Sequence, residues 1–466
     1  MNSFNEMCIR VSREIDTKSI RVRSRTEKEL IRYQYAVRHL LTDLWKAHWK
    51  HPDAECSINK RSGYYSENAR YRDPQLTYKM TVEQAFKGLI DLDLIRITKE
   101  GFYDRITYEG SLTRFKATHK LAEQFNELKG HPSVFLEPNL DVETIILRDT
   151  IDGKRVLQNY DDDKDTEQWR TNLKKINTCF SRHILDMYLK DIEFEKLQDE
   201  LLREDDKEPI DLTQKVLVRI FTNNSFESGG RFYRGWWQNV PKKYRQHITI
   251  DGKKTREFDF SQLNPNMIYD RHNLDLGSED AYDRVLDGKH RDIVKEAFNA
   301  MLQADKPLNQ KPNDINIDEI GMSWKELKEA ILDAHKPIQD KFFKGIGNRL
   351  QFEDSCVAEN VMMQFTDMNA PALPIHDSFI MHHGYSSYGE LEEAMRRGYH
   401  DRFKTSFKDN RELIKEVIHE EKKEEKPKNN DPNNIQWDNI DFDHLLEKEQ
   451  EYAKWNERNN DWMIRR

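Results

Sequence analysis

Two short apolar runs, each carrying one aspartate, constrain the fold of this chain more than any other feature. They are EFDFSQLNP (residues 257–265) and LPIHDSFI (residues 373–380). Each sets its aspartate, Asp259 or Asp377, within or at the end of a strand-like segment. The two residues are far apart in sequence, so only folding can bring them together. Two carboxylates on adjacent strands can share a pair of Mg²⁺ ions.

A third segment, RDIVKEAFN (residues 291–299), supplies cations at helical spacing. Arg291 and Lys295 are related as i and i+4 and therefore lie on one helix face. Facing the two aspartates, they would grip a triphosphate. Arg291 suits bidentate contact, and Lys295 is a point charge that can donate a proton to pyrophosphate. Taken alone, such a pair more often marks a solvated helix face.

A fourth segment, GGRFY (residues 229–233), combines two glycines with an arginine. Glycine lets the backbone approach a phosphate chain closely, and Arg231 would hold a primer or template strand. Cations and aromatic residues alternate after it, namely Arg234, Trp236, Trp237, Lys242, Lys243 and Arg245. This mixture suits a nucleic-acid groove, where rings stack on bases and cations follow phosphates. A hydrophobic turn with solvated charges is the alternative.

In this order, the four segments resemble the right-hand polymerases of family A and the single-subunit phage-type RNA polymerases. Motif A of that superfamily reads D-Y-S-Q-I-E or a relative, motif B reads R-x-x-x-K, and motif C reads H-D. A G-R turn precedes motif A. The matching residues are Asp259–Asn264 for motif A, Arg291 and Lys295 for motif B, His376 and Asp377 for motif C, and Gly230 and Arg231 for the turn. The resemblance covers about two-fifths of the chain.

The resemblance implies an α+β fold, in which a palm with a small antiparallel sheet carries helical fingers and a thumb. It implies a template-directed nucleotidyltransferase with two Mg²⁺ ions, or Mn²⁺, that acts on a primer and template with nucleoside triphosphates. Replication or priming of a phage, plasmid or mobile element is the implied setting. The implied catalytic residues are Asp259, Asp377 and Lys295, the metal ligands are Asp259, Phe260 and Asp377, and the substrate-binding residues are Arg231, Gln262, Asn264, Arg291, Asn299 and His376.

Two departures from the family pattern leave the choice of sugar open. The DNA polymerases carry a glutamate where Asn264 stands, and both groups carry a tyrosine where Gln303 stands. One alternative is therefore an RNA polymerase or primase that uses ribonucleotides. Another is a DNA-binding initiator or regulator with an inactive palm, and a third is addition of nucleotides to a strand end without a template.

The first 150 residues predict an arm and a small domain. Residues 1–25 are rich in arginine and lysine, which indicates a basic arm that contacts phosphates or a solvated tail. Residues 26–150 resemble a winged helix in the order and length of their expected elements, which predicts a winged-helix-like domain. A protein-contact or purely structural module is the alternative. Its expected helices cover 26–49 and begin at Thr81, where Thr81 and Gln84 form a T-x-x-Q capping box. The expected hairpin joins residues 95–98 to 102–108 through Gly101.

The rest of the chain divides by composition. We expect a helical thumb-like or linker region over 151–210, with the acidic run Asp161–Asp163 in a loop. The palm and fingers are expected over 211–415. Residues 416–466 are expected to hold a disordered charged linker and an amphipathic segment that docks on the body or binds a protein partner.

Bulk properties exclude several classes of protein. The formal net charge is −9 over 466 residues, which does not exclude nucleic-acid binding because the local clustering of cations decides it. The four cysteines show no C-x-x-C spacing, so neither a zinc site nor a disulfide framework is expected. The chain has no long apolar run and no signal peptide at its start. We therefore expect a cytoplasmic protein that does not bind membranes.

Overall fold

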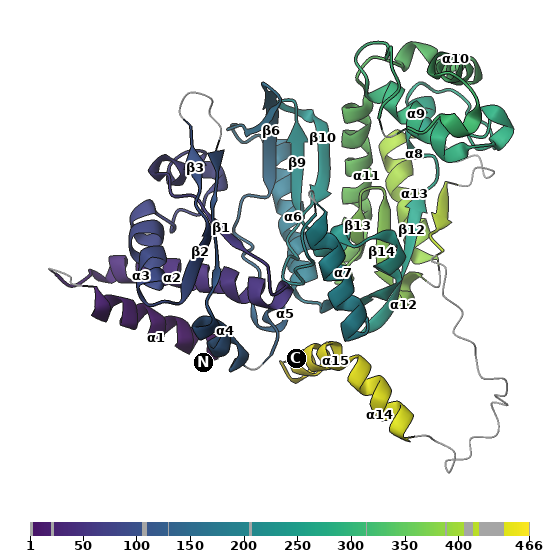
Figure 1. The fold of residues 1–466 in the computed structure, drawn as a ribbon. Coiled ribbons are helices and arrows are strands. Elements are labelled where there is room, and N and C mark those ends of the chain that lie inside the picture. The colour runs from purple at the N-terminus through teal and green to yellow at the C-terminus, as the bar shows by residue number, and fades with distance from the viewer. Residues whose placement is uncertain are drawn as a thin grey trace. The chain divides into compact units, whose positions relative to one another are not determined.

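The computed structural model describes residues 3–19, 23–104, 110–128, 130–204, 207–313, 315–386, 389–404, 413–418 and 442–465. It is a mixed α+β fold with several small sheets (Figure 1). The chain divides into two compact units. Unit 1 comprises Met1–Glu143, Ile184–Lys215 and Lys422–Arg466, and unit 2 comprises Thr144–His183 and Val216–Glu421. These units cut across the expected boundaries at 150, 210 and 415, because segments distant in sequence share one core.

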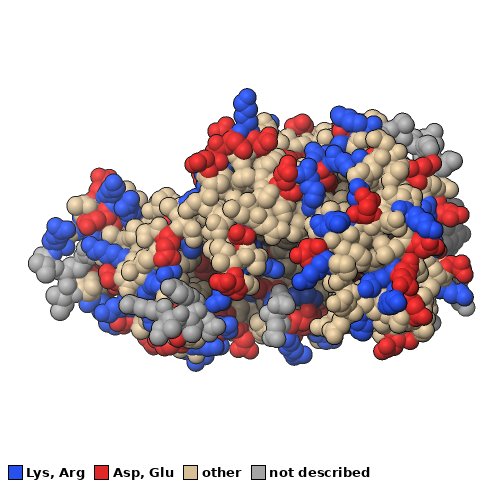
Figure 2. Space-filling view, turned by 90° about the horizontal axis from the view of Figure 1, so that it is seen from above, with Lys and Arg blue, Asp and Glu red and all other residues tan. Residues whose placement is uncertain are grey.

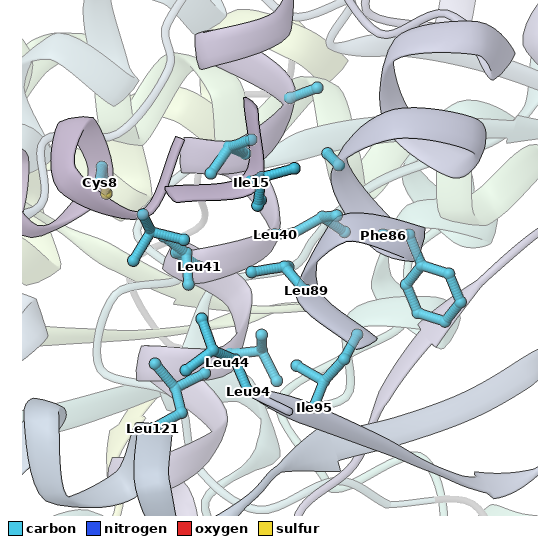
Figure 3. Close-up of a cluster of buried hydrophobic side chains, with 14 of the residues drawn as sticks. Cys8, Ile15, Leu40, Leu41, Leu44, Phe86, Leu89, Leu94, Ile95 and Leu121 are labelled. Atoms are coloured by element: carbon cyan, nitrogen blue, oxygen red, sulfur yellow. The ribbon is translucent and has the colours of Figure 1, made fainter. Parts of the chain in front are cut away.

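Unit 1 is built from helices and short strands. Its helices are α1 (Ser3–Lys18), α2 (Glu27–Lys50), α3 (Lys87–Asp91), α4 (His119–Asn126), α5 (Pro132–Phe135), α7 (Asp191–Arg203), α14 (Phe442–Glu451) and α15 (Ala453–Arg465). Its strands are β1 (Cys56–Ile58), β2 (Ile95–Lys99), β3 (Phe102–Tyr103), β4 (Gly110–Ser111), β5 (Thr113–Ala117) and β8 (Leu185–Met187). Leucine, isoleucine and phenylalanine side chains from the helices and strands form the core (Figure 3).

The expected basic arm is instead a helix of this core. Residues 3–18 form α1, and its apolar side chains are buried against α2 and α3. These side chains are Phe4, Met7, Cys8, Val11 and Ile15. Their spacing places them on one helical face. The arginines lie between them in sequence, so a dense count of cations concealed an amphipathic helix. Residues 20–22 lie outside the described part of the chain.

The second helix of unit 1 agrees with its expected range, and the third begins earlier than expected. In α2, Thr26 and Glu29 form a capping box, with Glu29 N donating to Thr26 Oγ at 3.3 Å. The next helical segment begins at Lys79 with π-type turns and continues into α3. The predicted cap at Thr81 is therefore wrong. Thr81 is buried inside the helix, and the side chain of Gln84 accepts a hydrogen bond from Arg25.

The predicted hairpin across Gly101 is also wrong. Strand β2 pairs with β5 in a three-stranded sheet of order β1-β5-β2, whereas β3 pairs with β4. A Cβ atom at Gly101 would lie 2.5 Å from the carbonyl oxygen of Ser111. The glycine thus permits a close backbone approach instead of forming a tight turn. Residues 105–109 of the expected second strand lie outside the described residues.

The C-terminal amphipathic segment belongs to unit 1. Helix α15 packs against α5 and α7. Arg458 on α15 forms a buried ion pair with Asp186, with its Nε 2.8 Å from Oδ2. Tyr452 stacks on Tyr188 at a centroid distance of 4.2 Å. Docking on the body, which the sequence left as one of two alternatives, is therefore observed. The charged run over residues 419–441 lies outside the described residues.

Unit 2 contains two sheets flanked by helices. Its strands are β6 (Ile145–Ile151), β7 (Lys154–Leu157), β9 (Val218–Thr222), β10 (Ser225–Tyr233), β11 (Ile248–Ile250), β12 (Lys253–Phe260), β13 (Leu373–Ile375), β14 (Ser378–His382) and β15 (Ile414–Glu416). Its helices are α6 (Lys164–Ser181), α8 (Leu263–Arg271), α9 (Arg291–Gln303), α10 (Trp324–Ala334), α11 (Gly347–Thr366), α12 (His383–Ser386) and α13 (Glu390–Phe403).

The two sheets of unit 2 are joined by α11. The first sheet has the strand order β10-β9-β6-β7. The second sheet contains the order β13-β14-β12-β11, and β15 also pairs with β12. Helix α11 runs beside β10 and packs against α6 and α13 (Figure 1). The acidic run 161–163 lies outside any strand, as expected. Its last member, Asp163, caps α6 by accepting a hydrogen bond from Thr166 N at 2.8 Å.

Two expectations drawn from composition concern membrane-spanning helices and the distribution of surface charge. Among the described residues, none of the helices has both the length and the apolar character needed to cross a bilayer. Cationic and anionic side chains are interspersed over the face that Figure 2 shows. The net negative charge is therefore not gathered into one acidic area on that face.

Candidate active site

Strand pairing brings the two aspartates of the apolar runs side by side. Strands β12 and β14 are antiparallel, with Asp259 opposite Ser378. The two-residue loop between β13 and β14 consists of His376 and Asp377, and Phe260 N donates to Asp377 O at 3.3 Å. His376 has φ 58°, which primed hairpin turns require at their first loop position. The hairpin thus presents Asp377 beside Asp259.

The two carboxylates interact electrostatically. Burial and the neighbouring charge of Asp377 raise the pKa of Asp259 to about 7, whereas Lys415 and Lys295 oppose that shift. Both aspartates are half-buried. Two like charges in a partly desolvated position repel each other, and a cation between them would relieve the repulsion. The site therefore has the charge that a divalent ion requires.

A pocket of about 320 Å³ opens beside Asp377. Its walls come from β10, β12, the start of α8, the middle and the end of α9, the start of α11, and the loops that carry Tyr282 and Asp377. The lining residues are Arg231, Phe260, Gln262, Leu263, Asn264, Tyr282, Lys295, Asn299, Leu302, Gln303, Gly347, Gln351 and Asp377. The fold thus gathers most of the residues singled out in the sequence around one cavity. His376 is not among the lining residues; its side chain is exposed, and its ring lies 5.8 Å from that of Tyr233.

Helix α9 carries two cations with different surroundings. Lys295 is exposed and lines the pocket. In the described part of the chain, no ion pair engages its ammonium group. Arg291 instead forms an ion pair with Asp280, with its Nη2 2.7 Å from Oδ2, and lies over the ring of Tyr282. Lys295 is therefore the cation of this pair that is available to a ligand in the pocket.

Amide side chains connect the helices at the pocket floor. Asn264 on α8 donates to Asn299 on α9, with Nδ2 and Oδ1 2.9 Å apart. Gln262 has φ 52° at the start of α8, and its side-chain oxygen accepts a hydrogen bond from Ala281 N. These contacts fix the amides relative to Lys295, so the floor of the pocket is polar but carries no net charge of its own.

Arg231 lies between two carboxylates. Its Nε donates to Asp354 Oδ2 at 2.9 Å, and Asp354 on α11 is buried. Burial raises the pKa of Asp354 to about 7, and the charge of Arg231 opposes this shift. Burial acts to lower the pKa of the Arg231 guanidinium, but the charge and hydrogen bonds of Asp354, and then the charge of Asp377, raise it above its usual value. The arginine thus links the pocket to α11.

The glycines before Arg231 serve the packing of β10. Gly230 has φ 79°, and a Cβ atom there would lie 2.9 Å from the ring of Phe221 and 3.2 Å from Ser355 Oγ. The sequence predicted that these glycines let the backbone approach phosphates. In the structure they let β10 approach β9 and α11 instead.

A buried arginine that the sequence did not single out supports this region. Arg219 on β9 is 1% exposed. Its guanidinium donates to four acceptors, namely Gly230 O at 2.8 Å, Glu359 Oε2 at 2.8 Å, Ser355 Oγ at 2.9 Å and Cys356 Sγ at 3.5 Å. It therefore fixes the turn before Arg231 against α11. Its signal in the sequence was weak, because one arginine in an apolar strand usually marks a solvated face.

The predicted aromatic groove is not formed by the tryptophans. Trp236 and Trp237 are both fully buried, and Trp237 Nε1 donates to Pro374 O at 3.0 Å. Arg245 forms an ion pair with the buried Glu257, which also accepts a hydrogen bond from Ser378 Oγ. These residues hold the β13–β14 hairpin in place, so base stacking on the two tryptophans is excluded.

A second cation missed in the sequence lies beside Asp259. Lys415 on β15 is directly opposite Asp259 across the strand pair, so both side chains project from the same face. Hydrogen bonds fix this register, with Ser261 N donating to Leu413 O at 2.7 Å and Val417 N donating to Glu257 O at 2.9 Å. Lys415 directly precedes the segment read as a charged linker, which concealed its place in the sheet.

The oxygen atoms near Asp259 and Asp377 are the kind of ligand that hard divalent cations prefer, but they are too few to complete a coordination shell. Asp259 and Asp377 supply carboxylates, and the main chain of Phe260 lies beside them. Among the described residues, no group of three or more His, Cys, Asp or Glu side chains is arranged to hold a metal. Mg²⁺ commonly binds through one or two carboxylates, with water and substrate phosphates completing its octahedron. The residues present therefore suit a metal that arrives with a phosphate substrate.

No protein-family model matches the chain, and no curated protein matches it. Among solved structures, the chain is similar to the POL domain of Pol1 from M. smegmatis, in complex with a DNA primer-template and dNTP. The sequence identity is 13%, the TM-score is 0.28, and the match covers 51% of this chain and 49% of that one. The match thus spans about half the length of that structure.

Proposed function

We propose that the chain is a template-directed nucleotidyltransferase that extends a primer with nucleoside triphosphates. The observation that carries the proposal is the register of β12 and β14. It brings Asp259 beside the hairpin that carries Asp377, and Asp377 lines a pocket together with Lys295 and Arg231. Paired acids beside cations suit a reaction in which negative charge moves between phosphate oxygens.

Each residue has a distinct proposed role. Asp259, Asp377 and the main chain of Phe260 would hold Mg²⁺, or Mn²⁺. Bound there, the ions would offset charge on the phosphates and lower the pKa of a primer 3′-hydroxyl. Lys295 would bind the triphosphate and donate a proton to the leaving pyrophosphate. The pocket amides, Gln262, Asn264 and Asn299, would contact the nucleoside.

The remaining predicted residues have supporting roles in this proposal. Arg291, held by Asp280, would add positive charge near the triphosphate without contacting it directly. His376 would contact the strand at the edge of the pocket. The partners would be a nucleic-acid template with its primer and nucleoside triphosphates. All these roles are inferred from placement and from the residue types.

A ribonucleotide-using enzyme is a second candidate. It is favoured by the amide pair Asn264–Asn299, which puts a neutral side chain where the DNA polymerases carry a glutamate. A neutral amide can donate or accept a hydrogen bond to a sugar hydroxyl, whereas a carboxylate only accepts. A primer-extension experiment should therefore supply dNTPs and rNTPs separately and compare the two rates of extension.

Primer extension on a defined template tests the proposal. Wild-type protein, Asp377→Ala and Asp333→Ala are each supplied with Mg²⁺ and with dNTPs or rNTPs. Asp333 is an acid on α10 whose side chain is 74% exposed, so it controls for loss of one charge. Asp377→Ala should slow incorporation about a thousandfold, a barrier increase of about 4 kcal/mol. Asp333→Ala should keep the wild-type rate. Extension by Asp377→Ala at the wild-type rate, or no extension by wild type with either nucleotide class, would refute the proposal.

A further inference from the structure

One face of the four-stranded sheet in unit 2 carries several arginines. Residues paired across neighbouring strands project from the same face of a sheet, and so does every second residue along one strand. Arg231 is paired with Ile220, Ile220 with Ile146, and Arg155 with Thr150. The residues that consequently project from one face are Arg148, Arg155, Arg231 and Tyr233. Arg234 follows directly at the end of β10.

The opposite face of this sheet is packed. Arg219, Phe221 and Phe232 project from it, and all three are buried. Trp169 of α6 stacks on Phe221 at a centroid distance of 5.0 Å and lies 4.9 Å from the Arg219 guanidinium. The arginine face is therefore the one turned away from α6. On it, Arg155 is exposed and Tyr233 is half-buried, and Arg234 at the end of β10 is exposed.

Positive charges act on one another across this face. Burial and then the like charge of Arg148 lower the pKa of the Arg234 guanidinium. Burial raises the pKa of Tyr233, while Arg231, Arg155 and Arg148 each oppose that increase. Within the residues that the structure describes, no carboxylate forms an ion pair with Arg155 or Arg234. The face thus concentrates positive charge that the fold leaves unneutralised at these two residues.

The backbone at Arg234 gives independent support. Its φ is 78°, in the left-handed region that favours glycine. A glycine would occupy this turn without strain, so the arginine is not explained by the fold. Strained backbone at a residue with a free charged side chain is typical of functional positions.

We propose that Arg155 and Arg234, with Arg148 beside them, bind the phosphodiester backbone of the nucleic-acid strand that adjoins the pocket. Arg231 lines the pocket and projects from the same face, so the surface is continuous with the site of reaction. Guanidinium groups bind phosphate oxygens through paired hydrogen bonds and release condensed counterions. The inference rests on the proposed function, because it assigns the path of the strand that the enzyme extends.

Binding of a labelled primer–template duplex, followed by fluorescence anisotropy without nucleotide or divalent ion, tests this surface. The variants are Arg234→Gly, Arg155→Ala and the double substitution. The control removes two exposed cations from α6 on the packed side of the sheet, as Lys164→Ala with Lys175→Ala. Each phosphate contact contributes about 0.9 to the slope of log affinity against log salt, which is about eightfold in affinity at 0.1 M salt.

We therefore expect the double variant to bind several tens of times more weakly than wild type at 0.1 M salt, with a slope lower by about 1.8. The control should bind like wild type. Arg234→Gly should keep the wild-type melting temperature, because glycine relieves the positive φ. Affinity and salt slope equal to wild type in the double variant would overturn the inference.

The outcome is separable from that of the proposed function. Asp377→Ala should bind the duplex like wild type yet extend it about a thousandfold more slowly. If wild type extends primers but the double variant binds normally, the surface is wrong and the enzyme stands. If wild type extends nothing, the proposed function fails first, and the strand path proposed here fails with it.

Discussion

Buried charged residues in unit 2 are held in position by side chains of opposite charge. The hydrophobic pattern of the sequence does not predict where they lie. Glu353 and Asp354 on α11 are both buried, and each is matched by arginine: Glu353 by Arg271, Arg349 and Arg402, and Asp354 by Arg231. Removing one partner of such a pair would leave a buried charge without compensation. The position of the pocket therefore depends on individual polar contacts along α11.

His335 makes the stability of unit 2 depend on pH. The ring is fully buried, with Nε2 3.1 Å from Ala281 O and Nδ1 3.2 Å from the hydroxyl of Tyr269. A neutral ring that donates from Nε2 and accepts at Nδ1 satisfies both contacts. Burial lowers the pKa of His335 from 6.5 to about 4. Between these values the unfolded chain binds a proton that the folded chain does not.

The free energy of unfolding should therefore fall as the pH decreases from 6.5 to 4, by up to about 3 kcal/mol from this residue. Urea unfolding at several pH values measures it. In His335→Gln, which cannot titrate, the dependence on pH should become shallower by about one proton. Equal slopes for the two proteins in this range would show that His335 is not buried in its neutral form.

At the scale of elements, periodic apolar residues were sufficient to predict α2. The apolar runs predicted β12, which carries Asp259, and the strands on either side of Asp377. Helices and strands in which charged residues stand between or beside the apolar ones were not predicted. The buried residues of α1 have helical spacing, but Arg10 and Arg13 between them suggested an arm. Strand β15 is short and adjoins a charged run. Its pairing with β12 is a long-range contact that local pattern does not encode.

The docking of α1 can be tested at Gly88. A Cβ atom there would lie 2.3 Å from Ile15 Cγ2, so α1 and α3 touch through this glycine. Gly88→Ala should lower the free energy of unfolding by about 1–3 kcal/mol through overpacking. Ile15→Ala alone should cost about 2–5 kcal/mol.

Combining the two substitutions reports on the contact itself. Because Ile15→Ala removes the atoms that the new methyl would meet, the double variant should lose less stability than the sum of the single variants. Urea unfolding measures all three. Strict additivity would mean that α1 does not pack on α3.

At the scale of the whole molecule, the chain crosses between its two units four times before it ends in unit 1. Helix α15 returns to residues 184–203, where Arg458 meets Asp186 and Tyr452 meets Tyr188. The core of unit 1 is consequently closed by segments from both ends of the chain. Order along the sequence therefore did not reveal the division into units.

The ion pair between Asp186 and Arg458 should be critical for this closure. Asp186→Ala leaves a buried guanidinium without its partner and should cost about 3–5 kcal/mol of stability. Replacing both residues, as Asp186→Leu with Arg458→Met, should recover most of that loss. Hydrogen exchange of α7 and α15 should increase together in the single variant. Unchanged protection of α15 in Asp186→Ala would contradict this account of the interface.

The central claim is that Asp259 and Asp377 act as one unit in phosphoryl transfer. Single-turnover incorporation of one nucleotide, measured for Asp259→Ala, Asp377→Ala and the double variant, tests it most directly. Residues that act together are strongly non-additive, so we predict that each single substitution slows the reaction about a thousandfold and that the double variant is no slower. Losses that multiply in the double variant, or a wild-type rate in either single variant, would contradict the claim.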